Sequence, residues 1–323
     1  MKKFSSRPAF TDESTLSRYF LSNQLHSGGE QRGDSMPRVA AIEFDESVQE
    51  PLIQGLKSIG IGDLNSEERT VAIKVGVFNT RTEQYTTVNM IDALVKAFDR
   101  APEIYLVESD SYGGPAEKRL EIWNEVYGGK VVPFSLSKDK NTREVKVTDE
   151  KVQLSHVIFK PNVFISTHVP RRFQDVGIND LMNTGSVLKN LLGLIPDKKK
   201  YRFHKKLPTA LIDMYEAIGG IDLAVLDGTY TFLGVKRKKS KTQTKILLIG
   251  RDAISVESVG AYLVGLDPME NPVIKEAMRR GLGEGDISKI EIFGSPIEPI
   301  RQNIIQSFRA LFPKRVQKMK GWI

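Results

Sequence analysis

The sequence contains no cysteine. Without thiols, the chain forms no disulfide, no thiolate metal site and no iron–sulfur cluster held by its own side chains. Any metal that it binds would be held by nitrogen and oxygen ligands, a set compatible with Mg, Mn, Fe, Ni or Zn. The absence of cysteine is also compatible with a cytoplasmic location.

Long apolar runs are missing too. No stretch approaches the roughly 18 apolar residues of a transmembrane helix. The N-terminal segment begins with basic side chains but contains no apolar stretch of signal-peptide length. We therefore expect a cytoplasmic protein that does not span the membrane.

Several catalytic motifs are absent. The chain has no P-loop, no G-x-G-x-x-G fingerprint, no G-x-S-x-G elbow and no H-E-x-x-H pair, which argues against the enzyme classes that these motifs define. The glycine signals are weak, and one of them is the turn Ser109–Gly114 before Pro115. Such a turn can hold an anion on the amides of the helix that follows.

Positive charge is in modest excess. Lysine and arginine number 47 against 40 acidic residues, for a formal net charge of +7, which is compatible with a phosphorylated ligand, nucleic acid or an anionic surface. Two segments, 198–206 and 236–245, concentrate basic residues with few aromatic side chains, a pattern typical of solvated loops. Binding of nucleic acid or an acidic partner through these loops and the C-terminal tail is the alternative functional hypothesis.

Short β-branched runs alternate with helical patterns along the chain. We expect strands at 39–44, 71–78, 103–107, 130–134, 221–226, 246–249 and 290–293, and helices at 51–59, 87–98, 115–123, 208–218, 256–263 and 271–281. Alternation of strands and helices over 71–134 is typical of parallel strands joined by crossover helices. The sequence therefore predicts an α/β protein with a mostly parallel or mixed sheet and helices on both faces.

Composition suggests the domain boundaries. Residues 1–38 are polar and rich in Ser, Gly and Arg, which predicts a flexible N-terminal extension. Residues 39–300 form the predicted α/β domain, with a division into two lobes near 135–155 left open. Residues 301–323 are amphipathic and basic, and predict a helix packed on the body.

Polar residues follow several predicted strands. They are Asn79, Glu108, Asp110, His168, Asp227 and Asp252. In open α/β sheets ligands bind at the carboxyl ends of the strands, so this recurrence favours a site there. Each residue also has a local explanation: Asp227 precedes Gly228 as in a turn, and Asp252 is placed to cap the next helix.

The segment Ser186–His204 concentrates the most unusual chemistry. Its apolar residues predict the end of a helix, with Gly193 expected in a left-handed conformation at the C-terminus. Lys189 and Asn190 lie inside the apolar run, where a cation needs an anionic partner. A basic stretch ending in His204 follows.

These observations favour a small-molecule enzyme acting on an anionic ligand. Its catalytic candidates are His168, His204 and Lys189, because histidine and lysine can transfer protons or hold a phosphate or carboxylate. The ligand-binding candidates are Lys74, Asn79, Glu108, Asp110, Asn190 and Arg251. The candidates for a divalent metal are Asp227, Asp252 and Glu257.

Taken together, the motifs resemble a widespread prokaryotic family called domain of unknown function 362. The matching residues are Ile73-Lys74, Glu108–Gly114, Thr167-His168, Lys189-Asn190 with Gly193, Pro196 and His204, Asp227-Gly228, and Asp252 with Val256-Glu257. The resemblance covers residues 70–294, and 189–196 is its most specific part. It implies a shared fold and shared motif residues, but the family name carries no general activity.

The sequence departs from the family pattern at three motif positions. Gly76 stands where the family has asparagine, Ser166 where it usually has lysine, and Glu257 where it has aspartate. Many relatives also carry cysteine-ligated ferredoxin modules, which this chain lacks. The resemblance therefore implies that any redox chemistry here would need a separate electron-transfer protein.

Overall fold

The computed structural model describes residues 36–174, 184–185, 187–235 and 238–311. The chain divides into two units, Met1–Met36 and Pro37–Ile323, and the second carries the fold. Most of the predicted extension 1–38, and residues 312–323 of the predicted C-terminal helix, lie outside the described residues.

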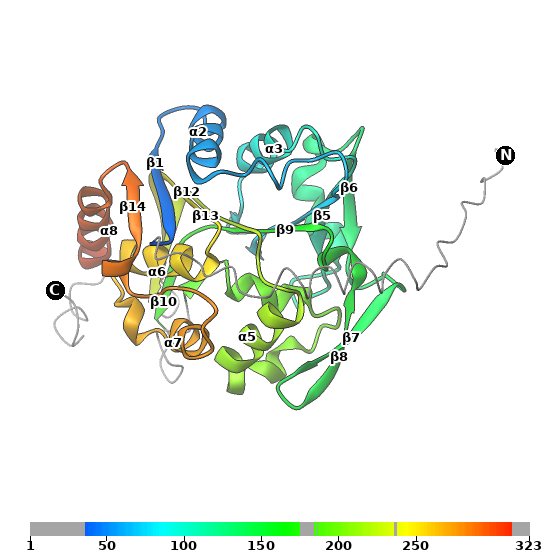
Figure 1. Cartoon of the computed structure of the whole chain (residues 1–323). Helices are drawn as coiled ribbons and strands as arrows, with labels where there is room; N and C mark the ends of the chain where they lie inside the picture. The colour runs from blue at the N-terminus through cyan, green and yellow to red at the C-terminus, as the bar shows by residue number, and fades with distance from the viewer. Residues whose placement is uncertain (1–35, 175–183, 186, 236–237, 312–323) are drawn as a thin grey trace. The chain divides into compact units, whose positions relative to one another are not determined.

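A mixed sheet forms the centre of the second unit (Figure 1), and in the described residues it contains ten strands. Eight lie in the order β14, β1, β13, β12, β9, β2, β5, β6. Their bounds are β1 Arg38–Glu43, β2 Val71–Lys74, β5 Ile104–Glu108, β6 Val131–Ser135, β9 Val163–His168, β12 Leu223–Val235, β13 Lys238–Gly250 and β14 Glu291–Gly294. Strands β12, β9, β2, β5 and β6 run parallel, whereas β13 is antiparallel to both β12 and β1. The predicted α/β class with a mixed sheet is confirmed.

The remaining strands are short. Strand β10 (Arg171–Gln174) runs parallel to the second half of β12, and β11 (Thr184–Gly185) pairs with β10. Two small hairpins lie apart from the main sheet: β3 (Val77–Asn79) with β4 (Gln84–Tyr85), and β7 (Thr142–Val147) with β8 (Glu150–Ser155).

Helices cover both faces of the sheet. Helices α2 (Gln49–Ile59) and α3 (Val88–Ala97) pack in one hydrophobic core, and α5 (Leu207–Ala217), α6 (Ala253–Leu263), α7 (Pro272–Arg279) and α8 (Ile297–Leu311) in the other (Figure 1). Helix α4 (Ala116–Leu120) continues into the 3-10 helix η1 (Glu121–Val126). The other 3-10 helices in the described part of the chain are η2 His156–Ile158, η4 Lys189–Leu194, η5 Lys200–Lys206, η6 Pro268–Glu270 and η7 Ile287–Lys289. Strand β2 shows the alternation that this layering requires, because Val71 and Ile73 join the α2 and α3 core while Ala72 joins the other.

Three predicted segments differ in the structure. The strand expected at 221–226 continues through Asp227 to Val235 in β12. The expected strand 71–78 is interrupted after Lys74, because the backbone at Gly76 passes against His168 instead of continuing the ladder. The predicted basic loop 236–245 is wrong over 238–245, which belong to β13. There the residues pair one for one with β12 from Lys238 opposite Val235 to Gln243 opposite Tyr230, so a long antiparallel ladder overrides the loop-like composition.

The parallel strands place their last residues at one edge of the sheet. Lys74 ends β2, Glu108 ends β5 and His168 ends β9. From β2 the chain adds β5 and β6 on one side, and later β9 and β12 on the other. Such a change of direction leaves a crevice at the carboxyl ends of the central strands.

In the described part of the chain, no helix combines the length and apolar character needed to cross a membrane.

Candidate functional site

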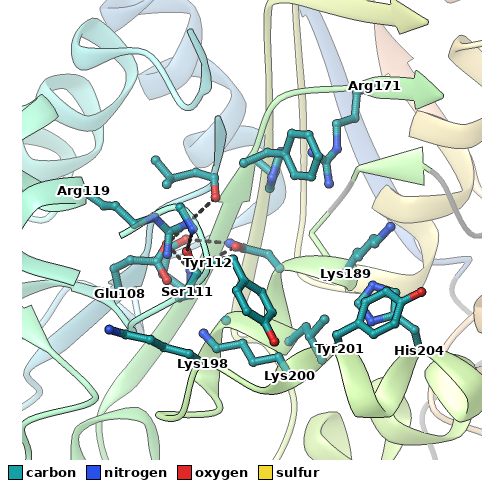
Figure 2. A pocket seen from close by; sticks show the side chains of 18 residues that line it. Glu108, Ser111, Tyr112, Arg119, Arg171, Lys189, Lys198, Lys200, Tyr201 and His204 are labelled. Carbon is teal, nitrogen blue, oxygen red and sulfur yellow. Dashed lines mark hydrogen bonds and ion pairs between the residues drawn. The ribbon is translucent and has the colours of Figure 1, made fainter. Parts of the chain in front are cut away.

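A cavity of about 290 Å³ opens at this edge of the sheet. Its lining includes the three strand-end residues Lys74, Glu108 and His168. The basic side chains around it, several of which are labelled in Figure 2, are Lys74, Arg119, Arg171, Lys189, Lys198 and Lys200. Among the described residues that line it, Glu108 is the single carboxylate, so basic side chains predominate in the lining.

The innermost group is a buried ion-pair triad of Lys74, Glu108 and Arg119. Lys74 Nζ lies 3.0 Å from Glu108 Oε2, and Arg119 Nη2 lies 3.3 Å from the same oxygen. Burial would raise the pKa of Glu108, but the charges of Lys74 and Arg119 outweigh burial and hold that pKa below its ordinary value. Burial also lowers the pKa of Lys74, and Glu108 opposes this shift. Within the triad, the one carboxylate therefore offsets the charge of one of the two basic side chains.

Asn190 fixes the position of Lys74. Its side-chain oxygen accepts a hydrogen bond from Lys74 Nζ at 3.1 Å, and its amide nitrogen donates to the carbonyls of Lys74 and Thr167, each at 3.0 Å. Asn190 thus joins the ends of β2 and β9 to η4, which explains why this residue is buried inside an apolar run.

Lys200 corrects the prediction of a solvated loop at 198–206. Its side chain is buried, with 8% of the residue exposed, and its ammonium group donates to Ser109 Oγ. Burial, opposed by Glu108, lowers the pKa of Lys200 to about 7. Neighbouring residues do behave as a surface: Arg202 pairs with Asp197 and Glu150, all partly exposed.

Lys189 and Arg171 add charge on the other side of the cavity. Burial, reinforced by the charge of Arg171 and opposed by Glu257, lowers the pKa of Lys189 to about 7. Burial also lowers the pKa of Arg171, to about 9. The Arg171 guanidinium lies 3.9 Å from the centre of the Phe78 ring, a cation–π contact that helps hold it at the cavity wall.

His168 lies at the end of β9, with 4% of the residue exposed. Its Nδ1 lies 2.8 Å from the backbone nitrogen of Val169 and 3.0 Å from its carbonyl oxygen. The backbone thus engages Nδ1 in either tautomer, and Nε2 is the ring nitrogen left for a molecule in the cavity. Burial and the charge of Arg171 hold the pKa of His168 well below its ordinary value, so the ring is neutral near pH 7.

His204 lies on η5 and lines the same cavity. Its ring stacks on Tyr201 with centroids 4.8 Å apart and planes inclined by 27°. Partial burial and the charge of Lys189 lower the pKa of His204. Both predicted histidines therefore face one cavity in their neutral forms.

Gly193 is required for a different reason from the one predicted. It lies within η4 and does not adopt the expected left-handed conformation. A Cβ atom at this position would lie 2.6 Å from Lys74 Cε and 2.8 Å from Lys74 Nζ. Glycine is needed because the buried lysine side chain passes directly over the backbone.

The departures at 76 and 166 are also explained by packing. A Cβ atom on Gly76 would lie 2.7 Å from His168 Cα, so this backbone leaves no room for a side chain there. Ser166 donates to the Val187 carbonyl at 2.8 Å and accepts from Asn190. In this chain Gly76 leaves room for His168, and Ser166 forms a hydrogen bond with Asn190.

The metal candidates Asp227, Asp252 and Glu257 do not come together as expected. Asp227 accepts hydrogen bonds from Thr87 and Thr229, and Asp252 from the backbone nitrogens of 254, 255 and 284. Glu257 accepts from the Leu188 backbone nitrogen at 3.1 Å. Within the described residues, no three His, Asp or Glu side chains form a group that could hold a metal ion. These contacts do not support a metal site at the three carboxylates, which stays a prediction from the sequence.

Three predicted ligand-binding residues do not line the cavity. Arg251 pairs with Asp63 at the surface, with a shortest distance of 2.6 Å. Asn79 accepts from two backbone nitrogens of its own turn. Asp110 accepts from the Ala116 backbone nitrogen and lies 3.8 Å from Lys198 Nζ, beside the cavity.

Sequence reasoning missed Arg119, Arg171 and Lys200 as site residues. A signal for Arg119 was present, because it lies three residues after Ala116 and four before Trp123, on the buried stripe of its helix. The position of Lys189 within an apolar run identifies that residue by the same argument. Arg171 and Lys200 lie in basic pairs or triplets, where nothing local distinguishes the residue that turns inward.

Comparison with known proteins identifies a family. The model of the family described as domain of unknown function (DUF362) matches residues 71–262, which include every residue lining the cavity. No curated protein matches the chain. Because the match covers more than half of the 323 residues, the chain belongs to the domain of unknown function 362 family.

Proposed function

We propose that this chain is an enzyme that binds a small phosphate- or carboxylate-bearing molecule in the basic cavity. The observation that carries this proposal is the lining itself: among the described residues, six basic side chains and one carboxylate surround a cavity of about 290 Å³. That volume lies at the lower end of ordinary ligand pockets, which span about 300 to 1,000 Å³, so it suits a small anion or the anionic part of a larger molecule.

The distribution of charge supports an anionic ligand. Glu108 already neutralises much of the charge of Lys74 and Arg119. Lys189 and Lys200 remain in a setting that lowers their pKa to about 7. Buried cations destabilise a protein unless an anion compensates them. A bound anion would raise both pKa values and offset the free-energy cost of burying the two charges.

We assign His168 the role of general base, with His204 and Lys189 as further proton-transfer groups. The neutral His168 ring can accept a proton at Nε2. An anion in the cavity would offset the charge of Arg171 and raise the pKa of His168, which makes the ring a stronger base only when the ligand is present. The proposal includes no step that depends on a metal.

The alternative, nucleic-acid binding through the basic segments, has less support. Arg202 and Lys206 of the first segment pair with Glu150 and Asp149. Their charge is therefore already compensated by acidic neighbours on this surface.

Titration calorimetry with pyrophosphate near pH 7 tests the proposal. We expect pyrophosphate to bind measurably to the full chain. Its affinity for Lys200→Gln should be at least about tenfold weaker, because this variant loses one charge-assisted hydrogen bond. Lys206→Gln is the matched control, because Lys206 is exposed and pairs with Asp149. Absence of binding to the unaltered protein, or equal weakening by both variants, would contradict a specific anion site in the cavity.

A further inference from the structure

Exposed aromatic side chains gather at the mouth of the cavity. Among the described residues, five large hydrophobic side chains are exposed, and three of them line the cavity. These are Phe78, Tyr112 and Tyr201, with 49%, 81% and 65% of their surfaces exposed. We call these three the aromatic rim. Scattered apolar residues are normal on a protein surface, but their concentration around one pocket indicates binding.

Tyr112 is held in place despite its exposure. It occupies the tip of a two-residue turn closed by reciprocal backbone hydrogen bonds between Ser111 and Gly114, each 3.0 Å long. The Gly113 nitrogen also donates to Ser111 Oγ at 3.0 Å. Turn tips usually carry small polar residues. A tightly held turn that presents a bare aromatic ring beside a pocket is therefore suited to stacking on a ligand.

The other two rim residues are oriented by neighbours within the cavity. Tyr201 stacks on His204, and Phe78 lies under the guanidinium of Arg171. Each contact fixes the plane of an aromatic ring whose remaining surface is exposed. Figure 2 shows Tyr112 and Tyr201 around the same opening as Lys198 and Lys200. Planar surfaces and cationic groups thus lie next to each other.

We propose that the ligand of this cavity is a nucleoside phosphate, whose phosphates lie among the lysines and whose base stacks on the aromatic rim. This inference rests on the proposed function and names its ligand class. The cavity volume of about 290 Å³ is sufficient for the phosphate part, and the base lies outside it against exposed rings. Because every base has an aromatic face, stacking gives affinity with little preference among bases.

Calorimetry on the full chain near pH 7, with pyrophosphate and the diphosphates of adenosine, guanosine, cytidine and uridine, tests this inference. We expect the nucleoside diphosphates to bind about five- to a hundredfold more tightly than pyrophosphate, the range for stacking of one base on aromatic side chains. Tyr112→Ala and Tyr201→Ala should each reduce that advantage, and should weaken nucleotide binding more than they weaken pyrophosphate binding. Tyr112→Phe should retain it, because the ring is preserved.

The outcomes separate the two proposals. If pyrophosphate binds and no nucleoside diphosphate binds more tightly, the nucleotide assignment is overturned while the anion site stands. If the nucleotides bind more tightly but the combined Tyr112→Ala and Tyr201→Ala variant keeps the full advantage, the rim is not the base site and the inference fails. If neither pyrophosphate nor nucleotide binds, both proposals fail.

Discussion

Polar residues lie in or next to strands in two regions of this sheet, and their roles differ between the two regions. At β12 and β13, Asp227 and Asp252 are occupied by nearby backbone and hydroxyl donors. At β2, β5 and β9, Lys74, Glu108 and His168 line a cavity. Both aspartates already accept hydrogen bonds from the groups packed beside them, whereas the longer side chains of lysine and arginine can extend into a common space. Polarity at a strand end therefore does not by itself identify a site.

The largest expected effect concerns the triad inside the cavity. Glu108→Gln should reduce the free energy of unfolding by roughly 3 to 5 kcal/mol, because it leaves Lys74 and Arg119 buried without a counter-charge. Urea denaturation measures this loss. Asp63→Asn breaks the exposed pair with Arg251 and should change stability by no more than about 1 kcal/mol. Similar losses in both variants would show that the triad is not energetically distinct.

The next effect separates the two regions by binding. Lys189→Gln should weaken pyrophosphate binding by roughly ten- to a hundredfold, since it removes one charge from the cavity. Asp252→Ala should leave the affinity unchanged, because Asp252 does not line the cavity. Titration calorimetry measures both, with circular dichroism to verify folding. The comparison between the regions breaks down if Asp252→Ala loses as much affinity as Lys189→Gln.

A smaller effect on stability is expected at Asp252. Asp252 caps α6 by accepting hydrogen bonds from Ile254 and Ser255. Asp252→Ala should therefore reduce the free energy of unfolding by about 0.5 to 2 kcal/mol. Asp252→Asn, which can still cap the helix, should lose less. An alanine variant as stable as the unaltered protein would mean that this carboxylate does not serve mainly as a helix cap.

The buried lysines should also make stability depend on pH. Lys189 and Lys200 have pKa values of about 7 in the folded chain, compared with about 10.4 when unfolded. Between these values the unfolded chain binds more protons, so their contribution to the free energy of unfolding rises with pH. The depressed pKa of His168 acts in the same sense and lowers stability as the pH falls below about 6.5. Urea titrations between about pH 6 and about pH 9 should show a smaller rise in Lys200→Met.

The sequence predicted the architecture well because hydrophobic periodicity is local information. It also identified Lys74, Glu108, His168, Lys189, Asn190 and His204, which lie together around the cavity. It could not show that Lys200 turns inward, since that depends on Ser109, 91 positions earlier in the chain. Nor could it separate a carboxylate that caps a helix from one that faces a ligand. Both differences arise from contacts between segments distant in sequence.

The central claim is that buried lysines in the cavity bind an anion, and sulfate calorimetry across pH tests it most directly. Sulfate does not titrate in this range, so changes in affinity report on the protein. Because Lys189 and Lys200 have pKa values of about 7, we predict that affinity falls as the pH rises through about 7. Above that pH, buffers of different ionisation enthalpy should reveal proton uptake on binding. Sulfate binding that is independent of pH and takes up no protons would contradict the account.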